Sequence, residues 1–429
     1  MFVDFLDFLI YRTPVFYLTQ SVWRDEVFSY FMSRPDILRI IVNTANDFNP
    51  PLYYLLLHFW GKFSGNSDIW LRLLSFVFHL TGVYFAYLLS RHLTNKKQSY
   101  YLSLFYLFNP MLIYYAFEMR MYSLYALTAT AAIYFFYTKN WKGYIISSVL
   151  GLYSHSFFIL IILSLSVYNF INRKLRKDLI KTLSPILFFL PWIPILAVQF
   201  VKSKESWLFP VDWQLIKSVL GNLFTAYEGT PGHLWKYTFY LSLAIVSFLI
   251  LCFRNNKLKG KMFILPIVIP LAFILTYSVI KRPIYVNRYL IFVSVFEVLA
   301  VFTGIISIKN QTVRKAVAFL WMIFIILFNL YITPFRKKTD FKTTFKEINK
   351  MAREEDAVYA MTPIGFLESA YYFKYPNKTF VYNPNKVHIP NYIGVNVVYP
   401  DISRTDFPPP PSRVFLVNDD ATFEVVFQQ

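Results

Sequence analysis

The chain has 429 residues, of which 56% are hydrophobic, 21% are aromatic and only 16% are charged. A soluble domain carries about 25% charged residues, so this composition indicates a membrane protein and excludes a disordered chain. The 43 Lys and Arg outnumber the 24 Asp and Glu, which gives a net charge of +19. The basic residues form short clusters between apolar runs, a pattern typical of cytoplasmic membrane loops and not of nucleic-acid binding. The single cysteine, Cys252, cannot form an internal disulfide.

The N-terminal segment 1–20 does not predict a complete membrane span. It contains Asp4, Asp7, Arg12 and Pro14, and it lacks the basic start and the small-residue cleavage site of a signal peptide. We therefore expect a poorly defined segment here, in which a first span is truncated or degenerate.

Apolar stretches of about 20 residues, the length that a membrane helix needs, follow from Arg72 onward. The stretch 143–170 is too long for one helix and is interrupted by Ser154-His155-Ser156, so we expect two short helices that meet at this tripeptide. With these two, the expected spans number ten: 72–92, 99–117, 121–138, the pair within 143–170, 182–201, 234–253, 262–280, 288–308 and 316–333. The predicted fold is an all-α polytopic bundle of about ten or eleven spans over residues 72–333.

The loop charges orient this bundle. If the loop 21–71 lies outside, the inside loops each hold two to five Lys or Arg, namely 91–97, 139–142, 173–181, 254–261 and 309–315. This alternation follows the positive-inside rule, and it holds only if 143–170 crosses twice. It predicts a multi-pass protein of the cytoplasmic membrane whose first loop and C-terminal tail are extracytoplasmic.

Two regions do not read as membrane spans. The loop 21–71 is expected to hold interfacial helices such as 52–63, and 202–232 is expected to be a second outside loop. After residue 334 the composition changes, and we expect a small α/β extracytoplasmic domain over 334–429. Its predicted elements are a helix at 340–355 and strands at 357–361, 379–382, 413–417 and 423–427.

Candidate catalytic carboxylates lie in the first outside loop, in Trp23-Arg24-Asp25-Glu26. An Asp beside the membrane could accept a proton from an acceptor hydroxyl and act as a general base. The same residues would equally suit the start of an amphipathic helix over 27–32. Farther along this loop, the residues Asn49, Pro50, Pro51 and Tyr53 could stiffen the chain next to a substrate site, although a Pro pair also starts helices well. His58 follows about two helical turns later and could belong to this substrate loop or simply lie on the face of a helix.

Candidate phosphate contacts lie at the other outside turns. Glu118 and Arg120 stand at a helix junction, where ionisable groups are usually functional, although the two could also simply compensate each other. His155, at the turn of the short helix pair, could donate to a phosphate oxygen or merely cap that turn. Arg288 and Tyr289, with Lys281 and Arg282, place cations on the outside, where they would bind an anion or anchor a helix at lipid headgroups.

Several of these motifs together resemble the membrane glycosyltransferases of the GT-C superfamily. The resemblance covers about residues 21–333, and its closest branch is bacterial, with lipid A aminoarabinose transferase, lipid A galacturonosyltransferases and relatives of protein O-mannosyltransferase. It rests on the order and spacing of Trp23-Arg24-Asp25-Glu26, Asn49-Pro50-Pro51-Leu52-Tyr53-Tyr54, His58-Phe59-Trp60, Arg72-Leu73-Leu74-Ser75, Phe117-Glu118-Met119-Arg120-Met121-Tyr122 and Asn287-Arg288-Tyr289-Leu290.

The resemblance implies a polyisoprenyl-phosphate sugar donor and a glycan, lipid or protein acceptor. It implies catalytic roles for Asp25, with Glu26 beside it, and for Glu118, which would face Asp25 across a cavity. It places donor-phosphate contacts at Arg120, His155 and Arg288. The sequence departs from the family at its unrecognisable first helix and at His155, which stands where the family has a basic residue.

Two other classes of function remain open on the sequence. A lipid or sugar transporter could use the same spans, and an inactive scaffold paralogue could use the tail to bind a partner. The absence of G-x-x-x-x-G-K-[ST], G-x-G-x-x-G and H-E-x-x-H disfavours P-loop pumps, nucleotide-binding enzymes and zincins. The six histidines are scattered, so no metal site is predicted, and the expected chemistry admits a divalent metal without requiring one.

Overall fold

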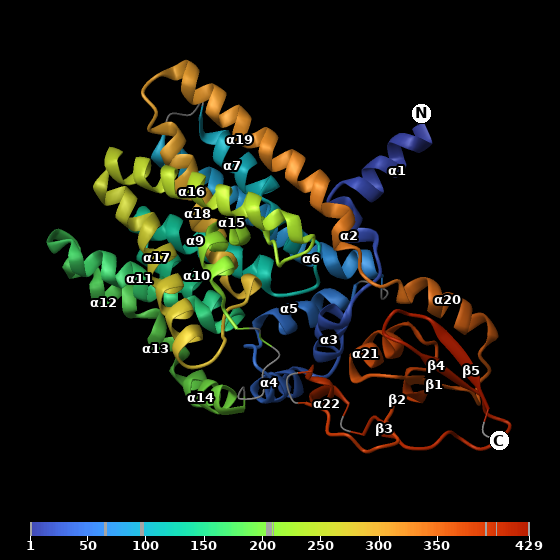
Figure 1. Cartoon of the computed structure of the whole chain (residues 1–429). Coiled ribbons are helices and arrows are strands. Elements are labelled where there is room, and N and C mark those ends of the chain that lie inside the picture. The colour runs from blue at the N-terminus through green and yellow to red at the C-terminus, as the bar shows by residue number, and fades with distance from the viewer. Residues whose placement is uncertain are drawn as a thin grey trace. The chain divides into compact units, whose positions relative to one another are not determined.

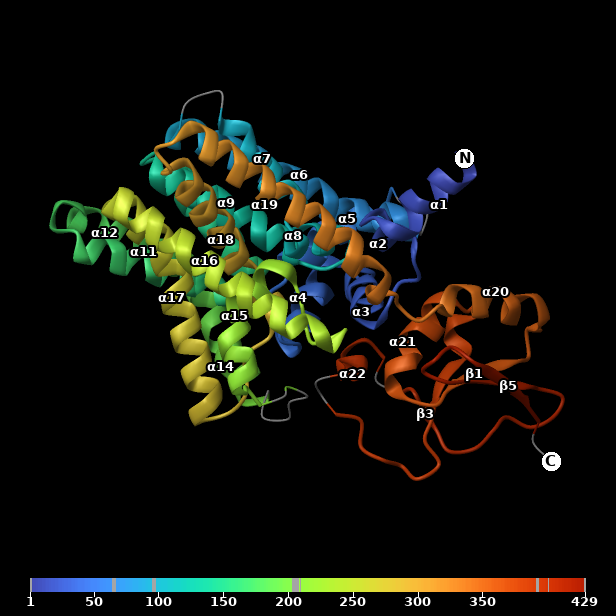
Figure 2. The same cartoon turned by 45° about the horizontal axis from the view of Figure 1, so that its top comes forward.

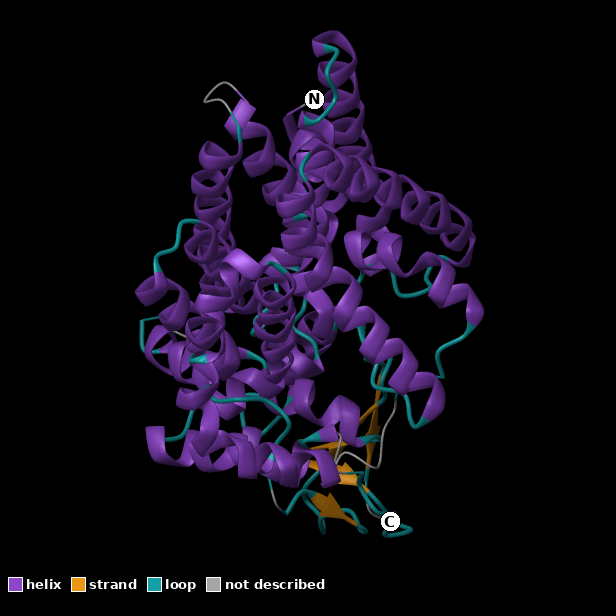
Figure 3. Cartoon of the chain, turned by 90° about the vertical axis from the view of Figure 1, so that its left-hand side faces the viewer, coloured by secondary structure: helices purple, strands orange, loops and turns teal. Residues whose placement is uncertain are grey.

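The computed structural model describes residues 2–63, 67–94, 98–202, 208, 210–390, 393–399 and 401–427. Residues 95–97, which end the first of the expected inside loops, lie outside this range. The chain divides into two compact units. We call residues 1–16, 72–196 and 207–335 the bundle unit, and residues 17–71, 197–206 and 336–429 the loop–tail unit. Figure 3 shows that helices dominate and that the strands form one small sheet.

The bundle unit contains the apolar helices. Six described segments are long and apolar enough to cross a membrane, namely Asp68–Leu93, Arg173–Lys202, Gly232–Asn255, Lys257–Ile280, Asn287–Ile306 and Gln311–Met351. Within and between them lie α6 (Asp68–Leu93), α7 (Ser99–Phe108), α8 (Pro110–Ala116), α9 (Tyr122–Tyr137), α10 (Trp141–Ser154), α11 (Ile159–Ile171), α12 (Leu179–Leu183), α13 (Pro185–Phe189) and α14 (Ile193–Lys202). They are followed by α15 (Trp213–Thr225), α16 (Trp235–Asn255), α17 (Lys257–Ile280), α18 (Ile291–Ile306) and α19 (Gln311–Ile332), while α1 (Phe2–Arg12) opens the chain.

Helix α18 is the most buried of these segments. It packs against α16 and α17, which also pack against each other (Figure 2). By contrast, α19 leaves Phe319 and Leu320 more than 60% exposed. Large apolar side chains exposed along apolar helices fit a lipid-facing surface, so the chain is an integral membrane protein.

The predicted break in the stretch 143–170 is confirmed. Helix α10 ends at Ser154, a 3-10 turn covers Ser156–Phe158, and α11 follows. Two other expected spans are also broken, and in both the sequence analysis missed the cause. The expected span 99–117 stops at Asn109-Pro110, where the Asn109 side chain caps α8 by accepting the N–H groups of Met111 and Leu112.

The expected span 182–201 lies within the candidate membrane segment Arg173–Lys202, but this segment consists of several short helical pieces, because Pro185, Pro191 and Pro194 each remove a backbone donor. The region 202–232, expected to be a loop, contains the 13-residue helix α15. The Asp212 side chain starts α15 by accepting the N–H of Leu215 at 2.7 Å. Helix α15 packs against α16 and α18, so residues 213–225 belong to the bundle unit.

The loop–tail unit joins the first loop, residues 21–71, to the C-terminal tail, two regions that the sequence analysis treated as separate. From the loop come α2 (Val15–Thr19, shared with the bundle unit), α3 (Arg24–Ser33), α4 (Ile37–Asn46) and α5 (Leu52–Gly61). The tail supplies α20 (Phe341–Met351), α21 (Pro363–Tyr372), α22 (Val395–Val398) and five strands (Figure 1). Helix α3 packs against both α5 and α21, so the loop and the tail share one folded body.

The strands form one mixed sheet in the order β3-β2-β1-β4-β5. They are β1 (Ala357–Ala360), β2 (Thr379–Tyr382), β3 (Ser403–Arg404), β4 (Val414–Val417) and β5 (Phe423–Val426), and only the β4–β5 pair is antiparallel. The four predicted strands are confirmed to within one residue at each end, whereas β3 and α21 were not predicted. The expected helix 340–355 is α20, which is shorter and is capped by Asp340.

Alternation along β1 gives this sheet two apolar faces. Val358 packs with Phe345 and Ile348 of α20 on one side, while Ala357 and Tyr359 pack with Val414 on the other. The ends of β1 and β4 are tied by an ion pair, in which Arg413 Nη2 lies 2.6 Å from Asp356 Oδ2.

Candidate functional site

The candidate residues fall into two groups, one in each unit. Arg24, Asp25 and Glu26, with Asn49, Pro50, Pro51, Tyr53 and His58, belong to the loop–tail unit. Glu118, Arg120, His155, Arg288 and Tyr289 belong to the bundle unit. The expectation that Glu118 faces Asp25 joins the two units and stays a prediction.

The two adjacent carboxylates occupy different environments in the first turn of α3. Glu26 is completely buried, and its Oε2 lies 3.0 Å from Nζ of Lys338, whose side chain is 7% exposed. The same oxygen accepts the backbone N–H of Trp23 at 3.3 Å, so Glu26 helps to start α3, as the helix-start alternative expected. The Asp25 side chain is 22% exposed, and its Oδ1 lies 3.9 Å from Nε of Arg24. Of these two carboxylates, Asp25 is therefore the accessible one.

The rest of the predicted substrate loop supports α5. Pro51 stands directly before this helix, which confirms the expected helix start. Pro50 and Tyr53 are buried, and the Asn49 side chain donates to Asp47 Oδ2 at 3.3 Å. His58 Nδ1 lies 2.8 Å from the carbonyl oxygen of Ser33, at the end of α3. A carbonyl can only accept, so His58 carries its proton on Nδ1 and ties α5 to α3.

In the bundle unit, Glu118 and Arg120 lie in the tight junction between α8 and α9. Both are buried, at 1% and 6% exposure. The Ser75 hydroxyl donates to the Arg120 carbonyl at 3.3 Å, and Ser123 donates to that of Tyr115 at 2.8 Å. These bonds fix the junction against α6 and α8. Ionised groups buried in an apolar bundle are costly, so their presence here favours a functional site.

His155 lies at the turn between the two short helices, as predicted, and its ring has a defined role. Its Nδ1 accepts the N–H of Phe157 at 3.2 Å. The proton of the neutral ring therefore sits on Nε2, which is left as a donor. The ring stacks on Tyr125 with centroids 4.8 Å apart and planes 4° apart, so its orientation is fixed.

Aromatic rings connect His155 to both arginines. The Arg120 guanidinium lies 5.8 Å from the Tyr122 ring centre, and that ring lies 6.5 Å from His155. On the other side, the Tyr289 ring lies 5.2 Å from His155, and the Arg288 guanidinium lies 6.0 Å from Tyr289. The structure thus brings together three predicted phosphate contacts that are far apart in sequence. We call Arg120, Tyr122, His155, Arg288 and Tyr289 the arginine–tyrosine cluster.

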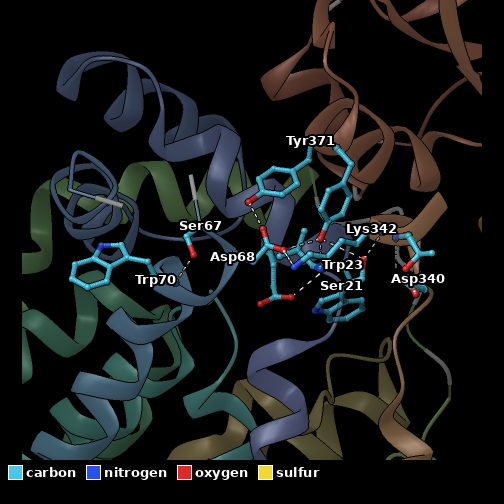
Figure 4. A network of polar contacts seen from close by, with 12 residues as sticks. Ser21, Trp23, Ser67, Asp68, Trp70, Asp340, Lys342 and Tyr371 are labelled. Carbon is cyan, nitrogen blue, oxygen red and sulfur yellow. Dashed lines mark hydrogen bonds and ion pairs between the residues drawn. The ribbon is translucent and has the colours of Figure 1, made fainter. Parts of the chain in front are cut away.

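The sequence analysis missed the tail residues that hold the first loop. Asp68 accepts hydrogen bonds from Lys342 Nζ at 3.0 Å, Tyr371 at 2.8 Å and Tyr372 at 3.2 Å, and Figure 4 shows Tyr371 and Lys342 pointing toward it. Lys338 and Glu368 contact the start of α3. None of these residues stands in a motif, although Thr362-Pro363 is a helix-start signal for α21. Among the described residues, no three His, Cys, Asp or Glu side chains are grouped to hold a metal.

The comparisons with known proteins concern the family and the fold of the chain. Residues 49–198 match the model of a family described as dolichyl-phosphate-mannose-protein mannosyltransferase. A search of curated proteins gave no match. Among solved structures, the crystal structure of ArnT from Cupriavidus metallidurans in the apo state is similar, with a TM-score of 0.62 and 12% identity. The match covers 97% of this chain and 91% of that one.

The family match spans the candidate residues from Asn49 to His155, and the structural likeness extends over nearly the whole chain. The first concerns the sequence of residues 49–198, and the second concerns the fold alone. The resemblance to GT-C membrane glycosyltransferases seen in the sequence is thereby confirmed: residues 49–198 match a mannosyltransferase family of that kind, and the chain has a fold similar to that of ArnT.

Proposed function

We propose that this protein transfers a sugar from a polyisoprenyl-phosphate donor to an acceptor hydroxyl on the extracytoplasmic face of the cytoplasmic membrane. The observation that carries the proposal is the arginine–tyrosine cluster, in which Arg120, His155 and Arg288 are linked by aromatic rings. Two arginines and a ring N–H suit the phosphate of a lipid-linked donor. The acceptor in this proposal is a glycan, a lipid or a protein.

The proposed reaction is a single displacement. Asp25 removes the proton of the acceptor hydroxyl, and the acceptor oxygen attacks the anomeric carbon. The bond from that carbon to the phosphate oxygen breaks, the polyisoprenyl phosphate leaves, and the anomeric configuration inverts. Arg120, His155 and Arg288 stabilise the charge on the leaving phosphate, and in an apolar setting such contacts are stronger than in water.

The carboxylates have different proposed roles. Asp25 is the general base, because its side chain is partly exposed whereas Glu26 is buried against Lys338. Glu118 is the second acidic residue of the site. No step requires a metal, because the phosphate monoester leaving group already has cationic partners.

The orientation is supported by the loop–tail unit. Residues 17–71 and 336–429 fold into one body, so they must lie on the same side of the membrane. The loop charges favour the extracytoplasmic side for this body. A labelling test with a membrane-impermeant thiol reagent on Lys350→Cys in intact cells would check this orientation.

The function is tested with the full chain purified in detergent. It is given a panel of radiolabelled polyisoprenyl-phosphate sugars, with Asp25→Asn and Glu26→Gln run in parallel. We expect one donor to be consumed by the wild type, and Asp25→Asn to lose turnover while it remains folded. Full turnover by Asp25→Asn would remove Asp25 as the base. If a folded wild type consumes no donor of the panel but moves one across vesicle bilayers, the protein is a transporter.

A further inference from the structure

Helix α3, which carries Asp25, has an N-cap residue whose own side chain accepts no backbone amide hydrogen. Its N-cap residue is Trp23, whose indole offers only a donor and cannot accept an amide hydrogen. Instead, the backbone N–H of Arg24 donates to Oε1 of Glu368 at 2.7 Å. Glu368 lies 344 positions later, in α21 of the tail. The tail therefore supplies an acceptor for the first amide of the helix that carries the proposed base.

A second residue of α21 holds the chain just before α3. The backbone N–H of Val22 donates to the Tyr372 hydroxyl at 2.9 Å. That hydroxyl in turn donates to Asp68 at 3.2 Å, within the network of Figure 4. Helix α21 thus binds two backbone amides, Val22 and Arg24, on either side of Trp23. Two such contacts fix both the position and the direction of the first turn of α3.

Burial of the Glu368 carboxyl group at the start of α3 costs free energy. Glu368 is 6% exposed, and its Oε2 is buried with no hydrogen-bond partner among the described residues. Burial, with the nearby Asp25 carboxylate adding to it, raises the pKa of Glu368 to about 8. Buried polar atoms without partners are rare and call for an explanation. The hydrogen bond that Oε1 accepts from Arg24, next to Asp25, explains why a carboxyl group is buried at this position.

We propose that Glu368 is a positioning residue, which caps α3 from the tail and so fixes the place of Asp25. This inference rests on the proposed role of Asp25 as the base. Asp25 is the second residue of α3, so fraying of the first turn would displace its carboxylate directly. The C-terminal domain then takes part in the transfer reaction by ordering the catalytic helix.

The test compares Glu368→Ala and Glu368→Gln in the full-length protein. Glutamine keeps an oxygen that can accept the Arg24 N–H, whereas alanine removes it. Near neutral pH the substitution to Gln also changes little charge, because the raised pKa keeps Glu368 largely protonated. The matched control is Glu347→Ala, which removes an exposed carboxylate from α20 of the same domain.

Two readouts are measured on each variant. The first is amide hydrogen exchange of a peptide that covers Val22–Val27. We expect Glu368→Ala to speed exchange there by about 2- to 30-fold, the range that corresponds to loss of an N-cap, while Glu368→Gln and Glu347→Ala exchange like the wild type. The second is sugar transfer. We expect Glu368→Ala to lower kcat with little change in KM for the donor or for the acceptor, and we expect Glu368→Gln to have a kcat close to that of the wild type.

Each failure has a distinct meaning. Unchanged exchange in Glu368→Ala would overturn the cap, whatever the activity. Faster exchange with an unchanged kcat would overturn the positioning role and leave a purely structural contact. A folded wild type that transfers no sugar would instead overturn the proposed function, and the exchange result would still decide the cap. If Glu368→Ala does not fold, Glu368→Asp, which shortens the reach by one methylene, takes its place with the same expectations.

Discussion

Nζ of Lys338 lies 3.0 Å from Oε2 of Glu26, and both side chains are almost entirely buried. The two residues are 312 positions apart in the sequence, and their ion pair joins the tail to the first turn of α3. Such a pair in a buried setting is costly to break, because the remaining charge stays out of water. The neighbouring Asp25 side chain is 22% exposed, so the two adjacent acids lie in different environments.

We therefore expect Lys338→Met to destabilise the loop–tail unit by about 3–5 kcal/mol, because it removes the cationic partner of a buried carboxylate while keeping the length of the side chain. Thermal unfolding of the full chain in detergent measures the change. Lys346→Met changes an exposed lysine of helix α20 in the same unit; it is the control and should unfold like the wild type. The double variant Lys338→Met with Glu26→Gln should recover part of the lost stability, because glutamine removes the buried charge that has lost its partner. Equal shifts for the two lysine variants would contradict a stabilising pair.

Much of the fold could be predicted because its helices and strands follow from the types of residue in short stretches of the sequence. The strands around Val358 and Phe415 stand out as short runs of branched and aromatic residues, and the break at His155 stands out as a polar tripeptide in an apolar run. The helix breaks at Pro110 and Pro185 were not predicted, because the spans were assigned from their apolar composition alone. That composition does not show that proline lacks a backbone N–H to donate. Helix α15 was missed because its polar flanks made the whole region look like a loop.

The candidate site was predictable only in part, for a related reason. Asp25, Arg120, His155 and Arg288 are visible as polar residues where an apolar chain turns. Glu368 is not, because its role depends on the Arg24 amide, which lies 344 positions away. The spacing of residues within a short motif does not predict a contact between residues so far apart in the sequence. The clustering of the two arginines likewise depends on which helices pack together, and the sequence does not predict that.

The phosphate role of Arg288 predicts a selective kinetic effect. Arg288→Ala should raise KM for the lipid donor by about ten- to a hundredfold, the range of a hydrogen bond to a charged group, and should leave KM for the acceptor nearly unchanged. Initial rates measured while each substrate is varied in turn would show this. Lys281→Ala removes an exposed cation of the same segment and serves as the control. An equal rise in both KM values would count against a contact with the donor phosphate.

The two nitrogens of His155 can be tested separately. His155→Asn keeps an acceptor for the Phe157 N–H but loses the donor at Nε2, whereas His155→Gln places an amide near the Nε2 position. We expect the Asn variant to fold and to bind the donor at least about tenfold more weakly, and the Gln variant to bind it more tightly than the Asn variant. Donor binding is measured by titration of the purified protein. The reverse order of affinities would mean that His155 only caps its turn.

The ion pair between Asp356 and Arg413 predicts how the stability of the tail depends on pH. Burial alone would raise the pKa of Asp356, but hydrogen bonds from Arg413 and from the backbone of Arg353 and Arg413 outweigh it and hold the pKa below the usual value. A carboxylate whose pKa is lowered by folding stabilises the folded state above its unfolded-state pKa of about 4, and this contribution is lost as the pH falls through the lower folded value.

Asp356→Asn should therefore lower the stability by about 1.5–3 kcal/mol at pH 7, the range for hydrogen bonds to a charged group, because it breaks the pair between the buried Asp356 and the partly exposed Arg413 that ties β1 to β4. The difference from the wild type should shrink as the pH falls below about 4, where the wild-type carboxylate begins to take up a proton. Thermal unfolding across this pH range provides the measurement. Asp401→Asn is the matched control, because Asp401 pairs with Arg404 in the same domain but its side chain is 83% exposed, so its loss should change little. If the deficit of Asp356→Asn stayed constant from pH 7 down to pH 3, the ionised pair would not be the source of the stability.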